Sequence, residues 1–95
     1  MAKKLPSFLQ SSLPSYDLSL LNIEEDKKLI ITSILNEGDF QALQWLAKTY
    51  SKKDIKNVIQ NPTRGSWYEW ILKYWLMILD INLDHAILKK AIIKL

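Results

Sequence analysis

Residues 67–81 read WYEWILKYWLMILDI, and this stretch decides the fold. It holds three of the chain's four tryptophans and two of its four tyrosines, but only three charged residues, Glu69, Lys73 and Asp80. At 100° per residue these three side chains define a polar arc about 40° wide. A helix with so narrow a polar arc needs apolar cover on most sides, so we expect a central helix wrapped by the rest of the chain.

The same helix suggests an interaction surface. Tryptophan and tyrosine are favoured as interface anchors because they give a large contact area at a small cost in side-chain entropy. We therefore also expect that part of the helix stays uncovered and binds a partner, together with a tryptophan from elsewhere in the chain. The residues predicted for this partner-binding patch are Trp45, Tyr68, Leu72, Trp75 and Leu79.

Length and composition restrict the class of protein. Ninety-five residues predict one domain, and the absence of cysteine excludes disulfides and thiolate metal sites, which favours a reducing, cytoplasmic location. The basic start is followed by Pro6 and several polar residues, so no signal peptide is expected, and no apolar run is long enough to span a membrane. The formal charge is +3, with acids gathered in residues 17–39 and bases in residues 48–64. This asymmetry favours a charged partner.

The hydrophobic periodicity is helical almost throughout and predicts an all-α fold. We expect a single compact bundle of four to six short helices, with an irregular, flexible N-terminal arm over residues 1–15 and one helical domain over residues 16–95. Asn22 and Glu25 form a capping-box-like pair that opens a first helix, Gly38 offers a left-handed stop, and Asp39 caps a second helix.

Three further helices are predicted in the second half. Ser51 caps a short helix that ends before Pro62, because the residue before proline is pushed out of helical geometry. Ser66 with Glu69 is a third capping pattern and is expected to open the aromatic helix. Residues 80–84 form a turn, and a last helix covers residues 85–95.

The sequence carries no catalytic signature. The single histidine, His85, follows Asp84 at a predicted helix start, with no nucleophile or oxyanion-donor motif near it in the sequence. The contiguous carboxylates of residues 24–26 lie at a helix N-terminus, where they favour the helix dipole. There is no glycine-rich phosphate loop, metal-binding histidine motif or nucleophile elbow. We therefore expect no enzyme activity, no cofactor and no metal.

Residues 47–59 resemble a helix-turn-helix in outline, with a short basic helix beginning at Ser51. This gives the alternative function, a small DNA-binding regulator that uses Lys52, Lys53, Lys56 and Arg64. The turn is tight and lacks glycine, and the first turn of the basic helix holds no cluster of arginine, asparagine or glutamine to read bases. A solvated basic face on an ordinary helix explains the same lysines.

The middle of the chain also resembles a small prokaryotic helical domain associated with genes for abortive-infection-type nucleotidyltransferase toxins. The strongest piece is Gly-Asp-x-x-Ala-x-x-Trp-Leu-x-x-Thr-Tyr over residues 38–50. The other matching residues are Tyr16, Asp17, Ile30, Ile31, Leu35, Ile55, Val58, Ile59 and Arg64. After Arg64 the chain departs from the pattern, with a longer aromatic helix and an added tail from Leu83.

The resemblance implies an antitoxin or accessory protein that acts by steric binding, and it brings no catalytic residues. Together with the aromatic helix, it predicts a cytoplasmic protein-interaction module. Its expected partner is another protein, such as a nucleotidyltransferase-like toxin, or a second copy of itself. DNA is the alternative partner, and no membrane binding is expected.

Overall fold

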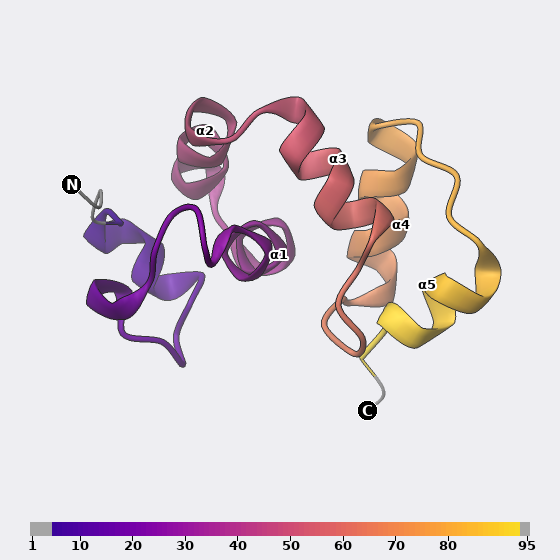
Figure 1. Cartoon of the computed structure of the whole chain (residues 1–95), viewed down its shortest axis with the longest axis horizontal. Helices are drawn as coiled ribbons and strands as arrows, with labels where there is room; N and C mark the ends of the chain where they lie inside the picture. The colour runs from indigo at the N-terminus through magenta and orange to yellow at the C-terminus, as the bar shows by residue number, and fades with distance from the viewer. Residues whose placement is uncertain (1–4, 94–95) are drawn as a thin grey trace. The chain divides into compact units, whose positions relative to one another are not determined.

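The structure is a computed structural model that describes residues 5–93, and all of its regular elements in that range are helices (Figure 1). This confirms the all-α fold class. The elements are two short 3-10 helices and five α-helices: η1 (Ser7–Ser11), η2 (Leu18–Leu20), α1 (Lys27–Glu37), α2 (Phe40–Thr49), α3 (Lys52–Gln60), α4 (Glu69–Ile78) and α5 (His85–Ala91). No helix within residues 5–93 is long and apolar enough to cross a membrane.

The chain divides into two compact units, which meet in the sequence between Tyr50 and Ser51. The first unit, residues 1–50, holds η1, η2, α1 and α2, and the second, residues 51–95, holds α3, α4 and α5. The single domain expected over residues 16–95 stays a prediction.

The core of the first unit is aliphatic and includes part of the N-terminal segment. Leu5, Leu9 and Leu13 are buried, and η1 packs against α2 and η2. The other buried apolar residues of this core come from α1, α2 and the tyrosine that follows α2: Ile30, Ile31, Ile34, Leu35, Ala42, Leu46 and Tyr50. Each fully buried leucine or isoleucine contributes about 1.5–3 kcal/mol. The described part of the expected arm therefore helps to hold the unit together.

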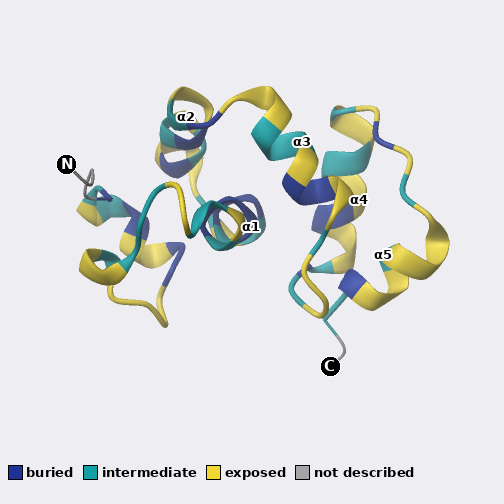
Figure 2. Cartoon of the chain, in the orientation of Figure 1, coloured by how far each residue is buried: buried dark blue, intermediate teal, exposed yellow. Residues whose placement is uncertain are grey.

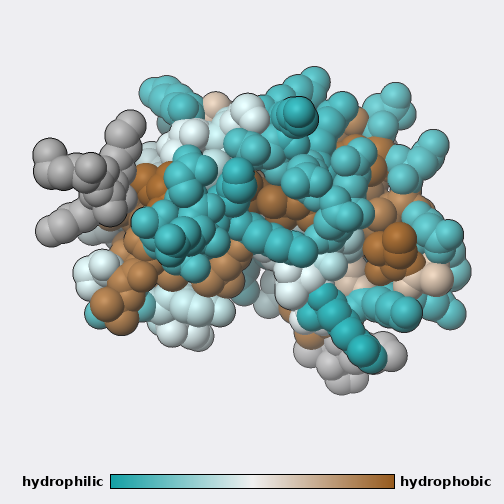
Figure 3. All heavy atoms as spheres, viewed as in Figure 1, coloured by the Kyte–Doolittle hydropathy of each residue, from teal (hydrophilic) through white to brown (hydrophobic). Residues whose placement is uncertain are grey.

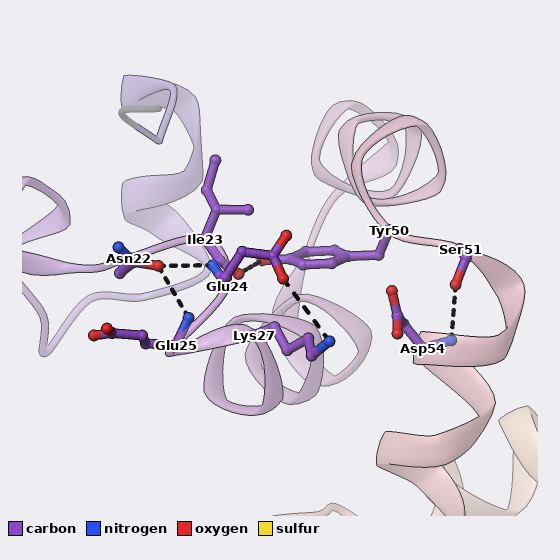
Figure 4. A network of polar contacts seen from close by, with 8 residues as sticks. All are labelled: Asn22, Ile23, Glu24, Glu25, Lys27, Tyr50, Ser51 and Asp54. Atoms are coloured by element: carbon purple, nitrogen blue, oxygen red, sulfur yellow. Dashed lines mark hydrogen bonds and ion pairs between the residues drawn. The ribbon is translucent and has the colours of Figure 1, made fainter. Parts of the chain in front are cut away.

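The start of α1 differs from the prediction by one turn. The Asn22 side chain accepts hydrogen bonds from the backbone amides of Glu24 and Glu25, at 2.9 and 3.0 Å (Figure 4). The Asp26 carboxylate in turn accepts from the Asn22 amide at 2.8 Å. This reciprocal pair closes a separate turn over residues 23–26, so the regular helix begins at Lys27 and not near Asn22.

Gly38 joins α1 to α2, but not by the left-handed stop that the sequence suggested. Its φ of −74° and ψ of 148° are extended, so the prediction of a left-handed residue is wrong. The residue must be glycine for space, because an added Cβ would lie 2.5 Å from the Ile34 carbonyl oxygen and 2.9 Å from the Ile34 Cγ2. Asp39 then caps α2 as predicted, accepting from the Ala42 amide at 2.9 Å.

Tyr50 ties the end of α2 to the start of the α1 region. Its hydroxyl donates a 2.8 Å hydrogen bond to the Ile23 carbonyl, 27 residues away in the chain (Figure 4). The ring is buried and meets Trp45 edge to face, with centroids 5.9 Å apart. One side chain thus supplies a long-range hydrogen bond and an aromatic contact of the kind that stabilises a helical pair.

The second unit begins at Ser51, whose hydroxyl accepts from the Asp54 amide at 3.1 Å and caps α3 as predicted. The helix ends at Gln60, before Asn61 and Pro62, again as predicted. Helix α3 packs against α4. The buried apolar residues of this unit are Val58, Ile59, Trp67, Ile71, Leu72, Ile81 and Ala91.

Backbone hydrogen bonds join the loop before α4 to the end of α5. The amides of Gly65, Ser66 and Trp67 donate to the carbonyls of Lys90 and Ala91 at 2.9–3.0 Å, and the Ile93 amide donates back to Trp67 at 2.8 Å. Trp67 and Ile92 form one parallel bridge.

This bridge explains two wrong boundaries. The Ser66 hydroxyl donates to the Thr63 carbonyl and does not cap a helix, so α4 begins at Glu69, without a side-chain cap. The last helix ends at Ala91 because the chain leaves helical geometry to pair with Trp67. Residues 94 and 95 of the predicted last helix lie outside the described residues.

Candidate interaction surfaces

One face of α4 is apolar and exposed. Trp70 is 73% exposed, Met77 71%, Ile78 53% and Tyr74 49%. Their spacing of four, three and one residues places them on one side of the helix. Figure 2 shows the exposed positions alternating with buried ones along α4, and Figure 3 shows apolar side chains reaching the surface of the protein. We call Trp70, Tyr74, Met77 and Ile78 the α4 face.

The α4 face is not the patch that the sequence predicted. Leu72 is fully buried, and Tyr68, Trp75 and Leu79 are half-buried, so the predicted patch faces largely inward. Trp45, from the first unit, is half-buried against Tyr50. The idea of a central helix covered on all sides is also wrong in the structure, because one side of α4 meets solvent.

The sequence did contain a signal for the exposed side. Glu69 and Lys73 form an exposed ion pair at 3.0 Å and mark the side of α4 that faces water. At 100° per residue, Met77 and Trp70 lie within about 60° of Lys73. The charged arc therefore marks the edge of the exposed side, and the apolar residues next to it belong to that side.

The four basic residues predicted to contact DNA fall into two groups. Lys52 and Lys53 are exposed and Lys56 is half-buried, and all three line an open concavity of about 530 Å³ on the outer face of α3. Asp54 lies among them. Arg64 lines a different concavity, so the predicted group of four does not form one surface.

Arg64 lies beside two lysines that the DNA prediction left out. A concavity of about 260 Å³ is lined by Arg64, Gly65, Lys89, Lys90 and Ile92. The sequence does not indicate a role for Lys89 and Lys90, because nothing in its spacing shows that the end of α5 pairs with residues 65–67. We call Arg64, Lys89 and Lys90 the junction cluster.

The candidate helix-turn-helix straddles the boundary between the units. Its first helix, α2, belongs to the first unit and its second helix, α3, to the second. The DNA-binding alternative therefore depends on the basic side chains of the second unit.

The two units differ in net charge. The first unit holds five bases and six acids, a formal charge of −1, and the second holds eight bases and four acids, a formal charge of +4.

The structure assembles no metal centre from the described residues. Within residues 5–93 no group of three or more histidine, aspartate or glutamate side chains is arranged to hold a metal ion. His85 is exposed at the first position of α5, and the Asp84 carboxylate next to it accepts from the Ala86 amide at 2.8 Å. Asp84 therefore acts as a helix cap.

Comparison with known proteins gives a match to a family model over part of the chain. Residues 15–59 match the model of a family of unknown function, DUF6922. Comparisons with curated proteins and with solved structures gave no match. The matched range covers most of the first unit and α3, whereas the α4 face and the junction cluster lie after it.

The residues of the 38–50 motif have structural roles. Gly38 allows the close approach at the corner between α1 and α2, and Asp39 caps α2. Ala42 and Leu46 are buried, and Tyr50 holds the Ile23 carbonyl. The matched segment thus specifies how the first unit packs, and it also carries the α3 lysines, whereas the α4 face and the junction cluster are in the part of the chain that follows it.

Proposed function

We propose that the chain is a protein-interaction module and that the α4 face is its contact surface. The observation that carries this proposal is the exposure of Trp70, Tyr74, Met77 and Ile78 on one helix face. Contiguous exposed apolar residues on a soluble protein are typical of interaction sites. Four anchors at helical spacing fit the mode in which an amphipathic helix lies in an apolar groove.

The energetics favour burial by a partner. Transferring a large apolar side chain from water to a protein interior contributes about 1.5–3 kcal/mol. Trp70 and Met77 are the two most exposed members of the face, so they gain most when it is covered. Tryptophan is also prominent among the few residues that dominate measured binding energies. We therefore assign Trp70 the central anchoring role.

The charge of the second unit specifies the partner further. The unit as a whole carries a formal charge of +4, which favours a partner with an acidic rim around its apolar groove. Such a rim would steer the encounter, while the apolar floor would hold the complex. A nucleotidyltransferase-like protein of the kind that the resemblance implies is the first candidate, with this chain acting as a steric antitoxin or accessory subunit.

The test is co-expression of the chain with such a nucleotidyltransferase, followed by light scattering of the purified material. We expect a complex of defined stoichiometry, and we expect the double variant W70A/M77A to weaken it by at least tenfold. Phe40→Ala is the matched control, because Phe40 is 75% exposed in the first unit and is also a large apolar side chain. Circular dichroism should show unchanged helix content in both variants.

Three results would contradict the proposal. Independent elution of the two proteins at micromolar concentration excludes this partner and the antitoxin role. A homodimer that W70A/M77A dissociates shows that the α4 face binds a second copy and not an acidic groove. In addition, iodide or acrylamide should quench Trp70 in the free chain, and protection of Trp70 in a monomer would show that the face is not available.

A second candidate, DNA binding, is supported by the α3 lysines. Lys52 and Lys53 are exposed on the outer face of α3, where they can reach phosphates. Affinity for duplex DNA should fall steeply with salt, and the slope should decrease in K52A/K53A, because each lost phosphate contact removes about one released counterion. No measurable binding at low salt would rule this candidate out.

A further inference from the structure

The junction cluster is built from two chain segments that the backbone holds in register. Arg64 precedes Gly65, whose amide donates to the Lys90 carbonyl at 2.9 Å. Gly65 has a φ of 66°, which is the left-handed conformation that glycine adopts without strain. The Ser66 and Trp67 amides donate to the Ala91 carbonyl, and Trp67 is fully buried. Arg64 is thus attached directly to a fixed part of the unit.

The same hydrogen bonds fix Lys89 and Lys90. Both belong to the last turn of α5, whose carbonyls are occupied by the loop amides. The result is a concavity of about 260 Å³ whose lining combines Arg64 from the loop with Lys89, Lys90 and Ile92 from the end of α5 and the residue after it. Arg64 and the two lysines line one concavity because residues 65–67 pair with residues 90–93. The sequence of either segment alone does not indicate this arrangement.

No described residue neutralises the charges in this concavity. Among residues 5–93, Arg64, Lys89 and Lys90 form no ion pair and no carboxylate lines the concavity. Like charges that line one concavity repel one another, since screening at physiological salt is largely complete only beyond about 8 Å. An anion between them would remove the repulsion and add charge-assisted hydrogen bonds.

We propose that the junction cluster is a phosphate-binding site. The guanidinium of Arg64 presents a planar set of donors suited to two phosphate oxygens, and the lysines supply mobile point charges from the other side. The volume equals that of about nine water molecules at roughly 30 Å³ each, which admits a phosphate or diphosphate with part of its hydration shell. The phosphate can come from a nucleic-acid backbone or from a free diphosphate.

A helix-dipole role explains only part of the cluster. Lysines in the last turn of a helix interact favourably with its C-terminal carbonyls, and this accounts for Lys89 and Lys90. It does not account for Arg64, which lies on a loop outside any helix. Arg64 is therefore the residue that separates a ligand site from simple helix stabilisation, and the experiment is centred on it.

The first experiment is titration of the ¹⁵N-labelled full chain with pyrophosphate, followed by backbone amide shifts. We expect saturable shifts confined to residues 64–67 and 89–92. Arg64→Ala should weaken binding at least tenfold, and Arg64→Lys should recover part of the loss. K52A/K53A is the matched control, since it removes two charges from the other basic concavity of the same unit, and it should change the affinity less than twofold.

The second experiment repeats the titration with a short DNA duplex and identifies the source of the phosphate. If the site binds a nucleic-acid backbone, DNA should compete with pyrophosphate, and Arg64→Ala should lower the salt slope by about 1. If it binds a free diphosphate, pyrophosphate should saturate the site and DNA should not displace it. W70A/M77A should leave both titrations unchanged, because the α4 face is not part of the junction cluster. The phosphate-binding proposal is therefore tested independently of the proposed protein-binding function.

The proposal is overturned if neither ligand shifts residues 64–67, or if the shifts spread over all lysines without saturation. It is also overturned if Arg64→Ala and K52A/K53A weaken binding equally, because that result shows a diffuse basic surface. Unchanged amide shifts of Trp67 and Ile93 in the free Arg64→Ala variant verify that the backbone pairing is intact.

Discussion

Gly38→Ala tests whether the corner between α1 and α2 requires glycine for space. An ordinary Cβ contact is 3.4 Å or more, whereas a Cβ here would lie 2.5 Å from the Ile34 carbonyl oxygen and 3.2 Å from the Ala42 Cβ. The same carbonyl accepts the Gly38 amide at 2.7 Å, so opening the corner also strains that hydrogen bond.

The expected magnitude combines two opposing terms. Overpacking a core costs about 1–3 kcal/mol. Replacing glycine by alanine restricts the unfolded chain, which stabilises the fold by about 0.4–1 kcal/mol. The net loss is about 1–2 kcal/mol, which corresponds to a decrease in Tm of roughly 5–15 °C for a chain of this size.

The assay is urea unfolding followed by circular dichroism at 222 nm, with amide hydrogen exchange in α1 and α2 as the local readout. Gly65→Ala is the control, because an added Cβ at Gly65 meets nothing within 4 Å and the penalty there comes from the positive φ alone. Gly65→Asn should recover part of that penalty, since asparagine tolerates the left-handed region, whereas Gly38→Asn should be at least as damaging as Gly38→Ala. A Gly38→Ala variant as stable as the wild type would refute the steric argument.

Three further changes probe single interactions. Tyr50→Phe removes the hydrogen bond to the Ile23 carbonyl and should cost about 1 kcal/mol in urea unfolding, with the loss of exchange protection concentrated in the first unit. Hydrogen bonds from the Ser19 hydroxyl and amide hold the pKa of Asp17 below its ordinary value. Ser19→Ala should therefore raise the pKa of Asp17 in an NMR titration. The ionised Asp17 stabilises the fold above its unfolded-state pKa, and this stabilisation is lost as the pH falls through the folded-state pKa. In Ser19→Ala the loss should therefore occur at a higher pH. Asp80 follows the C-cap of α4 and has a φ of 53°, a left-handed conformation that glycine adopts without strain. Asp80→Gly should therefore raise the Tm by a few degrees, and a lowered Tm would contradict backbone strain at this position.

Local signals in the sequence predicted much of the fold. The Asp39 and Ser51 caps and the stop at Pro62 depend on residues at most four apart, and all three are confirmed. The wrong boundaries have a different origin. Helix α4 starts late and α5 ends early because Trp67 pairs with Ile92, which is 25 residues away. Hydrophobic periodicity in the sequence does not indicate which residues so far apart in the chain contact one another.

The interaction surfaces were harder to predict than the helices. A helix with an apolar circumference gives little indication of which side is covered, so the choice of Leu72 as an exposed anchor was wrong. The sequence singled out Arg64 for its charge and as a residue of the family resemblance, with no indication of its neighbours in space. Its association with Lys89 and Lys90 requires the same bridge that determines the helix boundaries.

The distribution of constraint along the chain suggests a division of labour between its two units. In the first unit, Gly38, Ala42 and Tyr50 of the matched motif are each accounted for by packing, capping or a hydrogen bond. In the second unit, Trp70 and Arg64 are exposed, and the packing there explains neither of them. The α4 face groups four exposed large apolar residues on one helix, whereas α2 exposes only Phe40 among its large apolar residues, and this grouping is why we propose a partner for the second unit. Changes to exposed residues in the range 61–93 should therefore alter what the chain binds, as measured by complex formation, whereas changes to buried residues in the range 15–50 should alter stability and leave the partner unchanged.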